Sequence, residues 1–243
     1  MEITDDLDFQ HRDRQDIYEY VERMGEVALE EARQALHMDE RAIGHHVAIL
    51  KRDGILKEVD GQLQIAYDED TEAEFSGEDV SFTIRQARQA DLTGLVGAIR
   101  EVVENKTYVD AETVADVVDN EGVLLRHNEI ESRMFFVACV DDDVVGWVHI
   151  KHPEVAKLAH TAELTLGVLE AYRGNGMGSH LLSRGVEWAG NQGYEKLYNS
   201  VPATNEGAIE FLQSHDWSIE ATREDHYRID DEYVDEVMLA REL

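Results

Sequence analysis

The sequence contains almost no cysteine, and this excludes two common ways of stabilising or equipping a fold. Cys139 is the only cysteine among the 243 residues. One cysteine cannot form an intramolecular disulfide, and a zinc site built from several thiolates is not available. Because Cys139 lies in an apolar run from residue 134 to 140, we interpret it as a buried thiol on a strand, in preference to an acyl-carrying nucleophile.

Long apolar runs are also missing. No stretch of 18 consecutive apolar residues occurs, so the sequence predicts no membrane-spanning helix. The first residues, MEITDDLDF, are acidic, whereas a secretory signal peptide begins with basic residues. We therefore expect a cytoplasmic protein that does not engage a membrane.

Basic residues are scarce, and lysine is the scarcest of them. The chain has 53 Asp and Glu against 22 Lys and Arg, only six of which are lysine, and its formal net charge is −31. The acids are spread along the whole sequence, whereas a site for a basic partner would cluster them. At about 1 M salt the Debye length is ~3 Å, so repulsion within such a surface is screened. The composition is typical of a cytosolic protein from a halophile.

The most informative segment runs from residue 162 to 182 and reads AELTLGVLEAYRGNGMGSHLL. An apolar strand is followed by a turn with glycines at positions 174, 176 and 178, and then by an amphipathic helix. Glycines lack the Cβ atoms that would block a ligand, so several N–H groups can converge on an anion where the helix begins. The pattern predicts a phosphate-binding loop.

The spacing of this loop distinguishes between kinds of phosphate ligand. A Walker A loop requires a lysine followed by Ser or Thr after its last glycine, and Met177, Gly178 and Ser179 supply no lysine. A dinucleotide fingerprint requires two residues before its third glycine, whereas this loop reads G-x-G-x-G. The pattern R-x-x-G-x-G from Arg173 to Gly178 instead resembles the acyl-CoA pyrophosphate loop of the GNAT (Gcn5-related N-acetyltransferase) superfamily. The alternative is a glycine-rich turn without a ligand.

Residues further along the chain extend the resemblance. Val201 and Asn205 stand four residues apart in LYNSVPATNEGAIEFL, the spacing at which the family ends one strand and opens the next helix. The resemblance covers roughly residues 82–243. It implies acetyl-CoA as co-substrate and contact between Asn205 and the pantetheine arm. No metal site is expected, because His45-His46 and His149-x-x-His152 come without a nearby cysteine or a well-placed set of carboxylates.

The resemblance also implies that the strand at 163–168 parts from the strand at 195–201, and it implies roles for the strand and the loop. Main-chain groups of Leu166, Gly167 and Val168 would bind the pantetheine arm and the thioester carbonyl, with an amide near Val168 as the oxyanion donor. Arg173 and the main-chain amides that follow it would hold the pyrophosphate. These amides belong to Gly174, Asn175, Gly176, Met177, Gly178 and Ser179.

Glu163 is the candidate general base. It starts the same strand ten residues before Arg173, where many relatives of this family place an acid. The alternative is a solvated or structural carboxylate. Glu129 and Glu131 are weaker candidates for a pocket that accepts a cationic substrate, and ordinary solvation at a helix end is the alternative for both.

The general acid has no assignment. Many relatives have a tyrosine seven residues after the helix-opening Asn, where it protonates the departing thiolate, but that position is Leu212. Tyr198 or Tyr227 are the available substitutes, and a free thiolate is itself a tolerable leaving group.

Periodicity predicts two domains, residues 1–67 and 81–243, joined by an acidic linker at 68–80. In the first domain, three helical segments are followed by two short strands around Asp60-Gly61, and the second helical segment is expected from Val27 to Leu36. This order resembles a winged helix-turn-helix. The second domain is expected to be α/β (α+β), with the mixed sheet and flanking helices of the GNAT order. Its strands are expected at 82–86, 134–140, 144–150, 163–168, 195–201, 217–228 and 233–240, and its helices at 91–104, 111–126, 176–190 and 205–213.

Two functional hypotheses follow. The first is an N-acetyltransferase that transfers the acetyl group of acetyl-CoA directly to a primary amine in a ternary complex. The acceptor is a protein N-terminus, a lysine side chain or a small amine, and the oligomeric state stays open, with a homodimer among the alternatives. The second hypothesis is a transcription regulator that senses acyl-CoA.

The second hypothesis would use the outward face of the third helix to bind DNA. That face carries Arg41, His45, Lys51 and Arg52. However, residues 1–78 contain 8 basic and 22 acidic residues, a formal charge of −14. Because affinity for nucleic acid depends largely on neutralising phosphates, this charge favours the enzyme and a docking or dimerisation role for the N-terminal domain.

Overall fold

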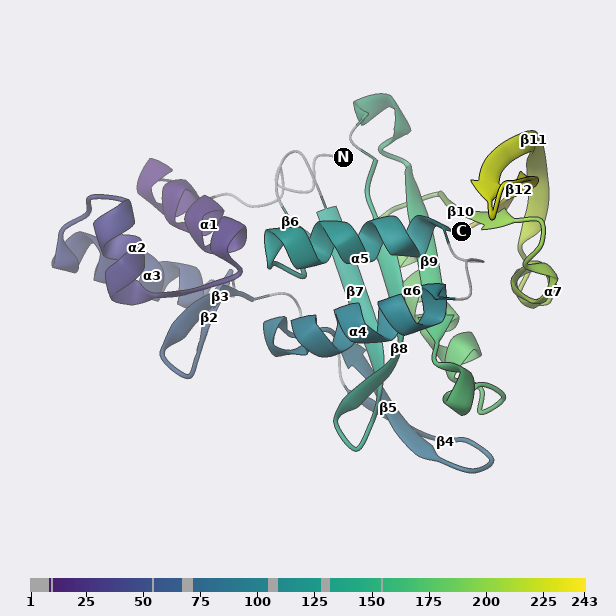
Figure 1. The fold of residues 1–243 in the computed structure, drawn as a ribbon. Coiled ribbons are helices and arrows are strands. Elements are labelled where there is room, and N and C mark those ends of the chain that lie inside the picture. Colours follow the sequence, from purple (N-terminus) through teal and green to yellow (C-terminus); the bar gives the residue numbers. More distant parts are fainter. Residues whose placement is uncertain are drawn as a thin grey trace.

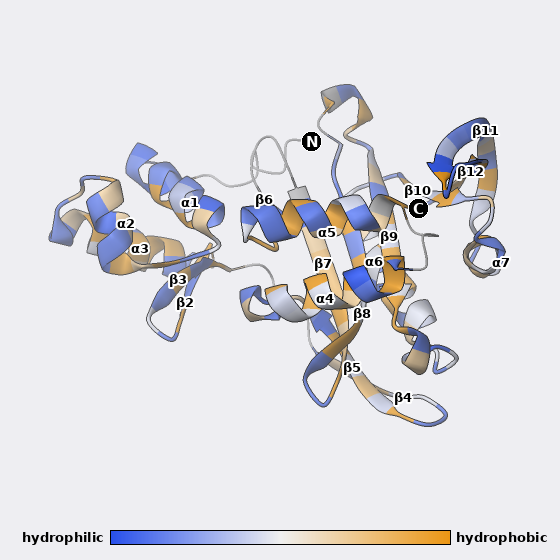
Figure 2. Cartoon of the chain, in the orientation of Figure 1, coloured by the Kyte–Doolittle hydropathy of each residue, from blue (hydrophilic) through white to orange (hydrophobic). Residues whose placement is uncertain are grey.

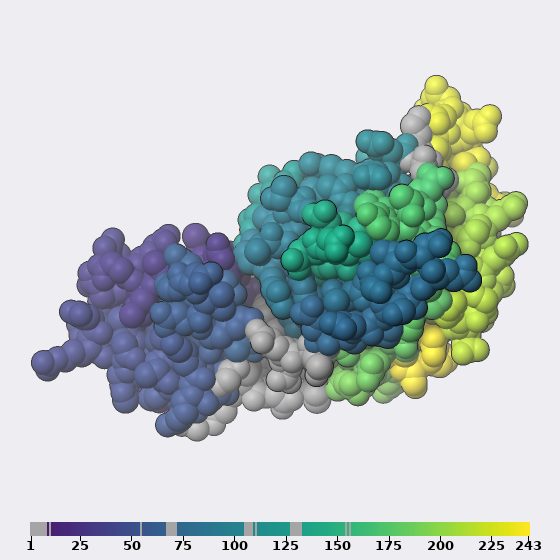
Figure 3. Space-filling model, turned by 90° about the horizontal axis from the view of Figure 1, so that it is seen from below, coloured from purple at the N-terminus to yellow at the C-terminus, as the bar shows by residue number. Residues whose placement is uncertain are grey.

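The structure, a computed structural model, describes residues 9, 11–53, 55–66, 72–104, 109–127, 132–153 and 155–243. The candidates Glu129 and Glu131 lie outside these described residues. Figure 1 shows a small N-terminal domain beside a larger domain in which helices pack on a sheet. Figure 3 shows the N-terminal domain as a lobe at one end of the molecule. Among the described residues, no helix combines the length and the apolar character needed to cross a membrane.

The N-terminal domain combines helices with a small antiparallel sheet of strand order β1-β3-β2. Its elements are α1 (Arg12–Met24), β1 (Glu26–Ala28), α2 (Leu29–Ala35), α3 (Glu40–Arg52), β2 (Leu56–Val59) and β3 (Gln62–Ile65). Helical periodicity and the Asp60-Gly61 turn predicted the helices and the hairpin β2–β3. The strand β1 is a correction, because we expected a helix to begin at Val27. Val27 instead pairs with Leu63 of β3 and is buried.

Local sequence accounts for the ends of these helices. Asp39 caps α3, because its carboxylate accepts hydrogen bonds from the amides of Arg41 (2.9 Å) and Ala42 (3.0 Å). Gly25 ends α1 with a φ of 75°, a conformation that favours glycine. The apolar faces meet in a separate core that includes Ile17, Val21, Ile43, Leu50, Leu56 and Leu63.

The predicted linker is partly a strand. β4 (Ala73–Ser76) pairs with β5 (Ser81–Gln86), so the larger sheet begins before the predicted boundary at residue 81. The reason is the apolar side chain of Phe75, whose ring centroid lies 5.5 Å from that of Phe82 and 4.0 Å from that of His180. Acidic neighbours concealed this short alternating segment in the sequence.

The larger domain is built on one mixed sheet of nine strands within the described residues, with the main order β11-β12-β10-β9-β8-β7-β5-β4 and with β6 beside β7. Its remaining strands are β6 (Arg126–His127), β7 (Ser132–Val140), β8 (Asp143–Lys151), β9 (Thr161–Val168), β10 (Lys196–Pro202), β11 (Ser218–Ile229) and β12 (Glu232–Glu242). The described pairs are antiparallel except for β9 with β10. The expected mixed sheet is therefore present.

Helices cover both faces of this sheet (Figure 1). The helical segments are η1 (Gln89–Asp91), α4 (Leu92–Val103), α5 (Val109–Glu121), η2 (Ala156–Leu158), η3 (Glu170–Tyr172), α6 (Met177–Asn191) and α7 (Glu206–Gln213). Residues of α4 and α5 form one core with Phe135 and Trp147, and residues of α6 form another with Val148 and Leu164. Figure 2 shows hydrophobic and hydrophilic residues alternating along α4 and α5, as expected for helices with one buried face.

A chain of charged residues joins the two domains. The Arg126 guanidinium donates to the main-chain oxygens of Glu22 and Arg23, each at 3.4 Å, and lies 3.7 Å from the Glu22 carboxylate. Nη2 of Arg126 lies 3.2 Å from Oε2 of Glu121, and Nη2 of Arg133 lies 2.7 Å from the same oxygen. Although burial opposes it, the hydrogen bond from Arg133 holds the pKa of Glu121 below its usual value. The N-terminal domain is therefore anchored to the end of α5.

Candidate active site

The strands β9 and β10 pair only briefly and then separate. Their parallel pairs run from Thr161 opposite Lys196 to Glu163 opposite Tyr198. Beyond this point β9 keeps its pairing with β8 as far as Val168. On the side of β10, no described strand pairs with residues 165–168, and their main-chain groups face the opening between the strands.

One side chain marks the point where the strands part. Asn199, the first residue of β10 beyond the paired segment, donates a hydrogen bond from Nδ2 to the main-chain oxygen of Leu164. This bond satisfies a carbonyl that has lost its strand neighbour. Because Asn199 is buried, the bond fixes where the separation begins.

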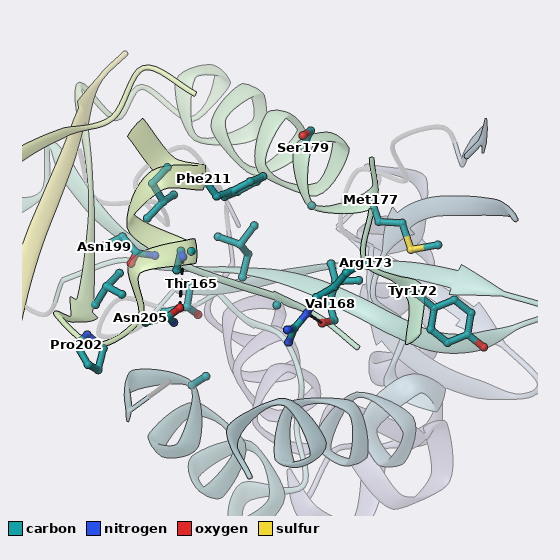
Figure 4. A pocket seen from close by; sticks show the side chains of 18 of the residues that line it. Thr165, Val168, Tyr172, Arg173, Met177, Ser179, Asn199, Pro202, Asn205 and Phe211 are labelled. Atoms are coloured by element: carbon teal, nitrogen blue, oxygen red, sulfur yellow. Dashed lines mark hydrogen bonds between the residues drawn. The ribbon is translucent and has the colours of Figure 1, made fainter. Parts of the chain in front are cut away.

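A cavity of about 590 Å³ lies between the separated strands. Figure 4 shows residues of β9, the glycine loop, β10 and α7 around it. The start of α5 closes another side, with Val109 and Ala111. Ten of the eleven residues predicted to bind the cofactor line the cavity: Leu166, Gly167, Val168, Arg173, Gly174, Gly176, Met177, Gly178, Ser179 and Asn205.

The glycine loop presents uncapped amides to this cavity. Gly174 and Gly176 have φ angles of 82° and 80°, which favour glycine. Gly176 directly precedes α6 and has no side chain that could cap the helix. The amides of Met177, Gly178 and Ser179 are in the first turn, where an α-helix has no internal acceptor for them. These amides and the helix dipole suit an anion such as a pyrophosphate.

Arg173 is folded back onto the strand that precedes the loop. Its Nε donates to the main-chain oxygen of Val168 at 3.0 Å (Figure 4). Its side chain is exposed. This bond places a positive charge between the end of β9 and the start of α6. Arg173 is therefore near enough to the loop amides to contribute to the same anion site.

Asn175 is the exception among the predicted residues, because it does not line the cavity. Its Oδ1 accepts from the amide of Asp79 at 3.1 Å, and its Nδ2 lies 3.3 Å from the oxygen of Tyr172. A Cβ atom on Gly77 would come within 2.8 Å of the Asn175 side chain. The side chain therefore holds the loop against the β4–β5 turn, a contact that loop spacing alone cannot predict.

Gly167 is explained by a contact on the opposite side of β9. It pairs with Trp147 of β8, and a Cβ atom at Gly167 would overlap the indole ring. Trp147 is completely buried. The glycine thus lets a large aromatic ring support the cavity wall from behind.

Glu163 lies beside the cavity and not in its lining. It is exposed, and it pairs in register with Lys151 of β8 and Tyr198 of β10. Because side chains alternate along a strand, Glu163 shares a face of the sheet with Thr165 and Gly167. The Cα atoms of Glu163 and Thr165 are then ~6.6 Å apart along the strand.

The suggested substitutes for a catalytic tyrosine do not reach the cavity. Tyr227 donates to Glu236 at 3.2 Å, and the ring of Tyr198 lies 5.3 Å from the Lys196 ammonium. Neither is among the described lining residues, whereas Leu212 is. The general acid therefore stays unassigned.

Thr165 is a cavity residue that we did not predict. Its Oγ1 lies 3.3 Å from Nδ1 of His149, whose ring stacks on Phe135 with 4.5 Å between centroids. Burial lowers the pKa of His149 to about 3, so this imidazole is neutral. Side chains alternate along a strand, so the choice of Glu163 could have indicated that Thr165, two residues later, faces the same side of the sheet. No sequence signal points to Val109 or Ala111, because α5 is distant from the loop along the chain.

Cys139 is buried, as predicted, and burial raises the pKa of its thiol. It belongs to the core beneath α4 and α5 and is not among the described cavity residues. A buried thiol with a raised pKa is a poor nucleophile.

Comparisons with known proteins agree with this architecture. Residues 101–217 match the model of the Acetyltransferase (GNAT) family. L-amino acid N-acetyltransferase AaaT of Escherichia coli (strain K12) is 28% identical over 106 residues, which cover 43% of this chain and 65% of that protein. YwnH of Bacillus subtilis (strain 168), whose name proposes phosphinothricin acetyltransferase activity, is 27% identical over 138 residues, which cover 55% of this chain and 82% of that protein.

Solved structures show the same fold. The yncA protein of Salmonella typhimurium, solved with its cofactor acetyl-CoA, is 19% identical and has a TM-score of 0.56, covering 67% of this chain and 94% of that one. The larger domain of this chain therefore has the mixed α/β fold of the GNAT acetyltransferases.

Proposed function

We propose that the protein is an N-acetyltransferase that moves the acetyl group of acetyl-CoA to a primary amine by direct transfer in a ternary complex. The observation that carries this proposal is the cavity between β9 and β10, which joins a free strand edge to the uncapped start of α6. The pyrophosphate would bind the main-chain amides of Gly174, Gly176, Met177, Gly178 and Ser179, with Arg173 beside them, whereas Asn175 would hold the loop in place. The pantetheine arm would follow residues 166–168 and meet Asn205.

The opening between the strands connects the two faces of the sheet, and this supports a division of roles. The loop and α6 lie on one face, and the start of α5 lies over the other, beside Thr165. Acetyl-CoA would enter from the α6 face and present its thioester to an amine on the α5 face. Glu163 shares that second face, and this supports a role for it as a general base that acts through water.

The transfer itself needs few groups. The amine nitrogen forms a bond to the thioester carbon, the negative charge moves to the carbonyl oxygen, and the C–S bond then breaks to release the thiolate. An amide near Val168 would donate to the oxyanion, a contribution of about 3 kcal/mol for one such donor. Glu163 would first take a proton from the substrate ammonium, because only the neutral amine can attack. The second proton on nitrogen would leave the tetrahedral intermediate to solvent or to the departing thiolate.

The lining favours an acceptor that does not carry several positive charges. Among the described lining residues Arg173 is the one charged side chain, and no Asp or Glu faces the cavity. A polyamine would therefore find no counter-charge there. AaaT is named for L-amino acids and YwnH for phosphinothricin, which supports a small amino acid as the acceptor, ahead of a protein N-terminus or a lysine side chain.

The proposal is tested by measuring thiol release from acetyl-CoA in molar KCl against amino acids, polyamines, aminoglycosides and N-terminal peptides. We expect release that depends on the acceptor and is greatest with amino acids. Tight CoA binding without turnover on any acceptor would refute the enzyme and favour the acyl-CoA-sensing regulator.

We further propose that residues 1–67 form a winged helix-turn-helix module that serves as a docking domain. The element order α1-β1-α2-α3-β2-β3 supports this. Two cations of the expected DNA-binding face are already neutralised, since Lys51 lies 2.6 Å from Glu58 and Arg52 lies 2.8 Å from Asp53. A sequence-selective complex in a gel-shift titration with promoter DNA would contradict a docking role.

A further inference from the structure

His215, just beyond α7, is bonded to the first turn of α6. Its Nε2 lies 2.9 Å from Oγ of Ser179, a residue that lines the cavity. Its Nδ1 lies 2.8 Å from the main-chain oxygen of Phe211. The imidazole therefore connects a fixed carbonyl to a hydroxyl at the proposed anion site.

These two contacts determine which nitrogen carries a hydrogen. A carbonyl oxygen can only accept, so the Nδ1 contact with Phe211 requires a hydrogen on Nδ1. Oγ of Ser214 also lies 3.1 Å from Nδ1, but the Ser214 hydroxyl donates its hydrogen to the main-chain oxygen of Phe211 at 2.6 Å, so toward Nδ1 it can only accept. When the imidazole is neutral, Nε2 has no hydrogen and must accept the hydroxyl hydrogen of Ser179. Ser179 then offers only lone pairs to an incoming anion.

Protonation of His215 reverses this bond. Both ring nitrogens then donate, and Ser179 accepts from Nε2. The Ser179 hydroxyl hydrogen becomes available for a phosphate oxygen, and a positive charge lies one hydrogen bond from the anion. Charge-assisted bonds of this kind are roughly twice as strong as neutral ones.

The surroundings of His215 permit this change. From β12, Arg241 donates to the main-chain oxygen of His215 at 2.9 Å, which leaves the ring contacts undisturbed. Asp216 follows it in the chain and is exposed. On α6, His180 stacks on Phe75 with 4.0 Å between centroids, toward the β4–β5 turn. The ring itself is half-buried, so a proton can enter from solvent.

We propose that the pyrophosphate of the coenzyme binds together with a proton taken up from solvent by His215, and that His215 acts as a positioning residue through Ser179. This inference rests on the proposed function, which places the pyrophosphate at the start of α6. The predicted consequence is that affinity falls as pH rises through the range in which histidine loses its charge, by at most about tenfold per pH unit for one proton.

The test is calorimetric binding of dephospho-CoA between pH 6 and 8, in molar KCl and in pairs of buffers with different ionisation enthalpies. Dephospho-CoA keeps the pyrophosphate and lacks the terminal phosphate monoester, which itself titrates in this range. We expect wild-type protein to take up as much as one proton on binding, and its affinity to fall with pH.

Two variants distinguish the effect of the His215–Ser179 hydrogen bond, called the relay below, from a general effect of pH on binding. In His215→Gln the amide can donate to Ser179 at any pH, so we expect affinity close to the wild-type value at pH 6, without proton uptake. In Ser179→Ala the relay is broken, and we expect weaker binding and reduced uptake. Circular dichroism and thermal unfolding check that both variants are folded.

Each outcome has a definite meaning. Binding of dephospho-CoA by wild type without proton uptake, or equal uptake by wild type and His215→Gln, overturns the inference and leaves the acetyltransferase proposal intact. Absence of any coenzyme binding by wild type overturns both. If the variants fail to fold, the nitrogen-15 NMR shifts of the wild-type histidines decide, because one imidazole must become protonated when the ligand is added.

Discussion

At the scale of single residues, Gly174 and Gly176 have no side chain that could cover or cap the first amides of α6. The positive φ angles of Gly174 and Gly176 and the uncapped start of α6 agree with the predicted loop. Side-chain direction could not be predicted in the same way. Asn175 turns away from the cavity, and Thr165 turns toward it because His149 and the strand alternation orient it.

The role proposed for Glu163 predicts a separation of binding from chemistry. Glu163→Gln removes the proton acceptor but keeps the size of the side chain, so we expect the acetyl transfer rate to fall about 10²- to 10⁴-fold. The Kd for CoA should stay within about twofold, because Glu163 does not line the cavity. The measurements are single-turnover kinetics and calorimetry. Glu170→Gln, at another exposed carboxylate of the same region, is the control, and an equal loss there would contradict the assignment.

The buried His149 predicts sensitivity to acid. Its folded-state pKa of about 3 lies below the ordinary value of about 6.5, so the unfolded chain binds more protons once the pH falls below 6.5. Stability is therefore lost as pH falls from 6.5 toward 3, by about 1.4 kcal/mol per unit at most.

For His149 this amounts to about 2 kcal/mol between pH 7 and pH 5. Urea unfolding at both pH values measures it. In His149→Gln this part of the loss should disappear, whereas His160→Gln, at an exposed histidine, should retain it. An unchanged pH dependence in His149→Gln would show that the imidazole is not buried in its neutral form.

At the scale of helices and strands, the period of the apolar residues predicted long elements well and short ones poorly. The helices α4 and α6 and the hairpin β7–β8 lie where their periodicity indicated. The strands β1 and β4 are too short to show a period. β1 forms because β3, distant along the chain, pairs with it, and β4 forms because β5 pairs with it across a short turn. The separation of β9 from β10 was expected only through the family resemblance, since strand sequences do not encode where pairing stops.

The contact between the β4–β5 turn and the glycine loop predicts that a small change in the turn disturbs the proposed anion site. In Gly77→Ala the new methyl group would collide with Asn175, so the loop must shift. We expect a loss of ~1–3 kcal/mol in stability, as for other overpacked sites, and at least a tenfold weaker CoA affinity.

Calorimetry with CoA and thermal unfolding measure these two effects. The matched control is Gly97→Ala, on α4, where a Cβ atom meets nothing within 4 Å. Its stability should be unchanged or higher by up to ~1 kcal/mol, because alanine favours the helix. Normal CoA affinity in Gly77→Ala would show that the turn does not support the loop.

At the scale of the whole molecule, Arg126 joins the two domains through Glu22 on one side and Glu121 on the other. In Arg126→Met the apolar length of the side chain is kept while its charged contacts are lost. We expect a loss of about 2–3 kcal/mol, as for bonds between charged groups with little exposure. Scanning calorimetry should then resolve two transitions in place of one.

The control for Arg126 is Arg228→Met. Arg228 lies 2.8 Å from Asp231, but both side chains are exposed, at 63% and 89%. An exposed pair contributes about 0–1 kcal/mol, so this variant should unfold as wild type does. Identical behaviour of the two variants would mean that the domains are not coupled through Arg126.

The short pairing of β9 with β10 also means that the sheet is held together less firmly there than elsewhere. Three pairs of residues hold the strands β4 to β9 against β10 to β12, whereas β7 and β8 pair along their whole length. Without ligand, amide hydrogens of β10 beside the opening between β9 and β10 should exchange with deuterium faster than those of β7. A bound coenzyme that contacts β9, the loop and α7 would link the two parts of the sheet across the opening between β9 and β10. Its binding should therefore slow amide exchange in β9 and in β10 together.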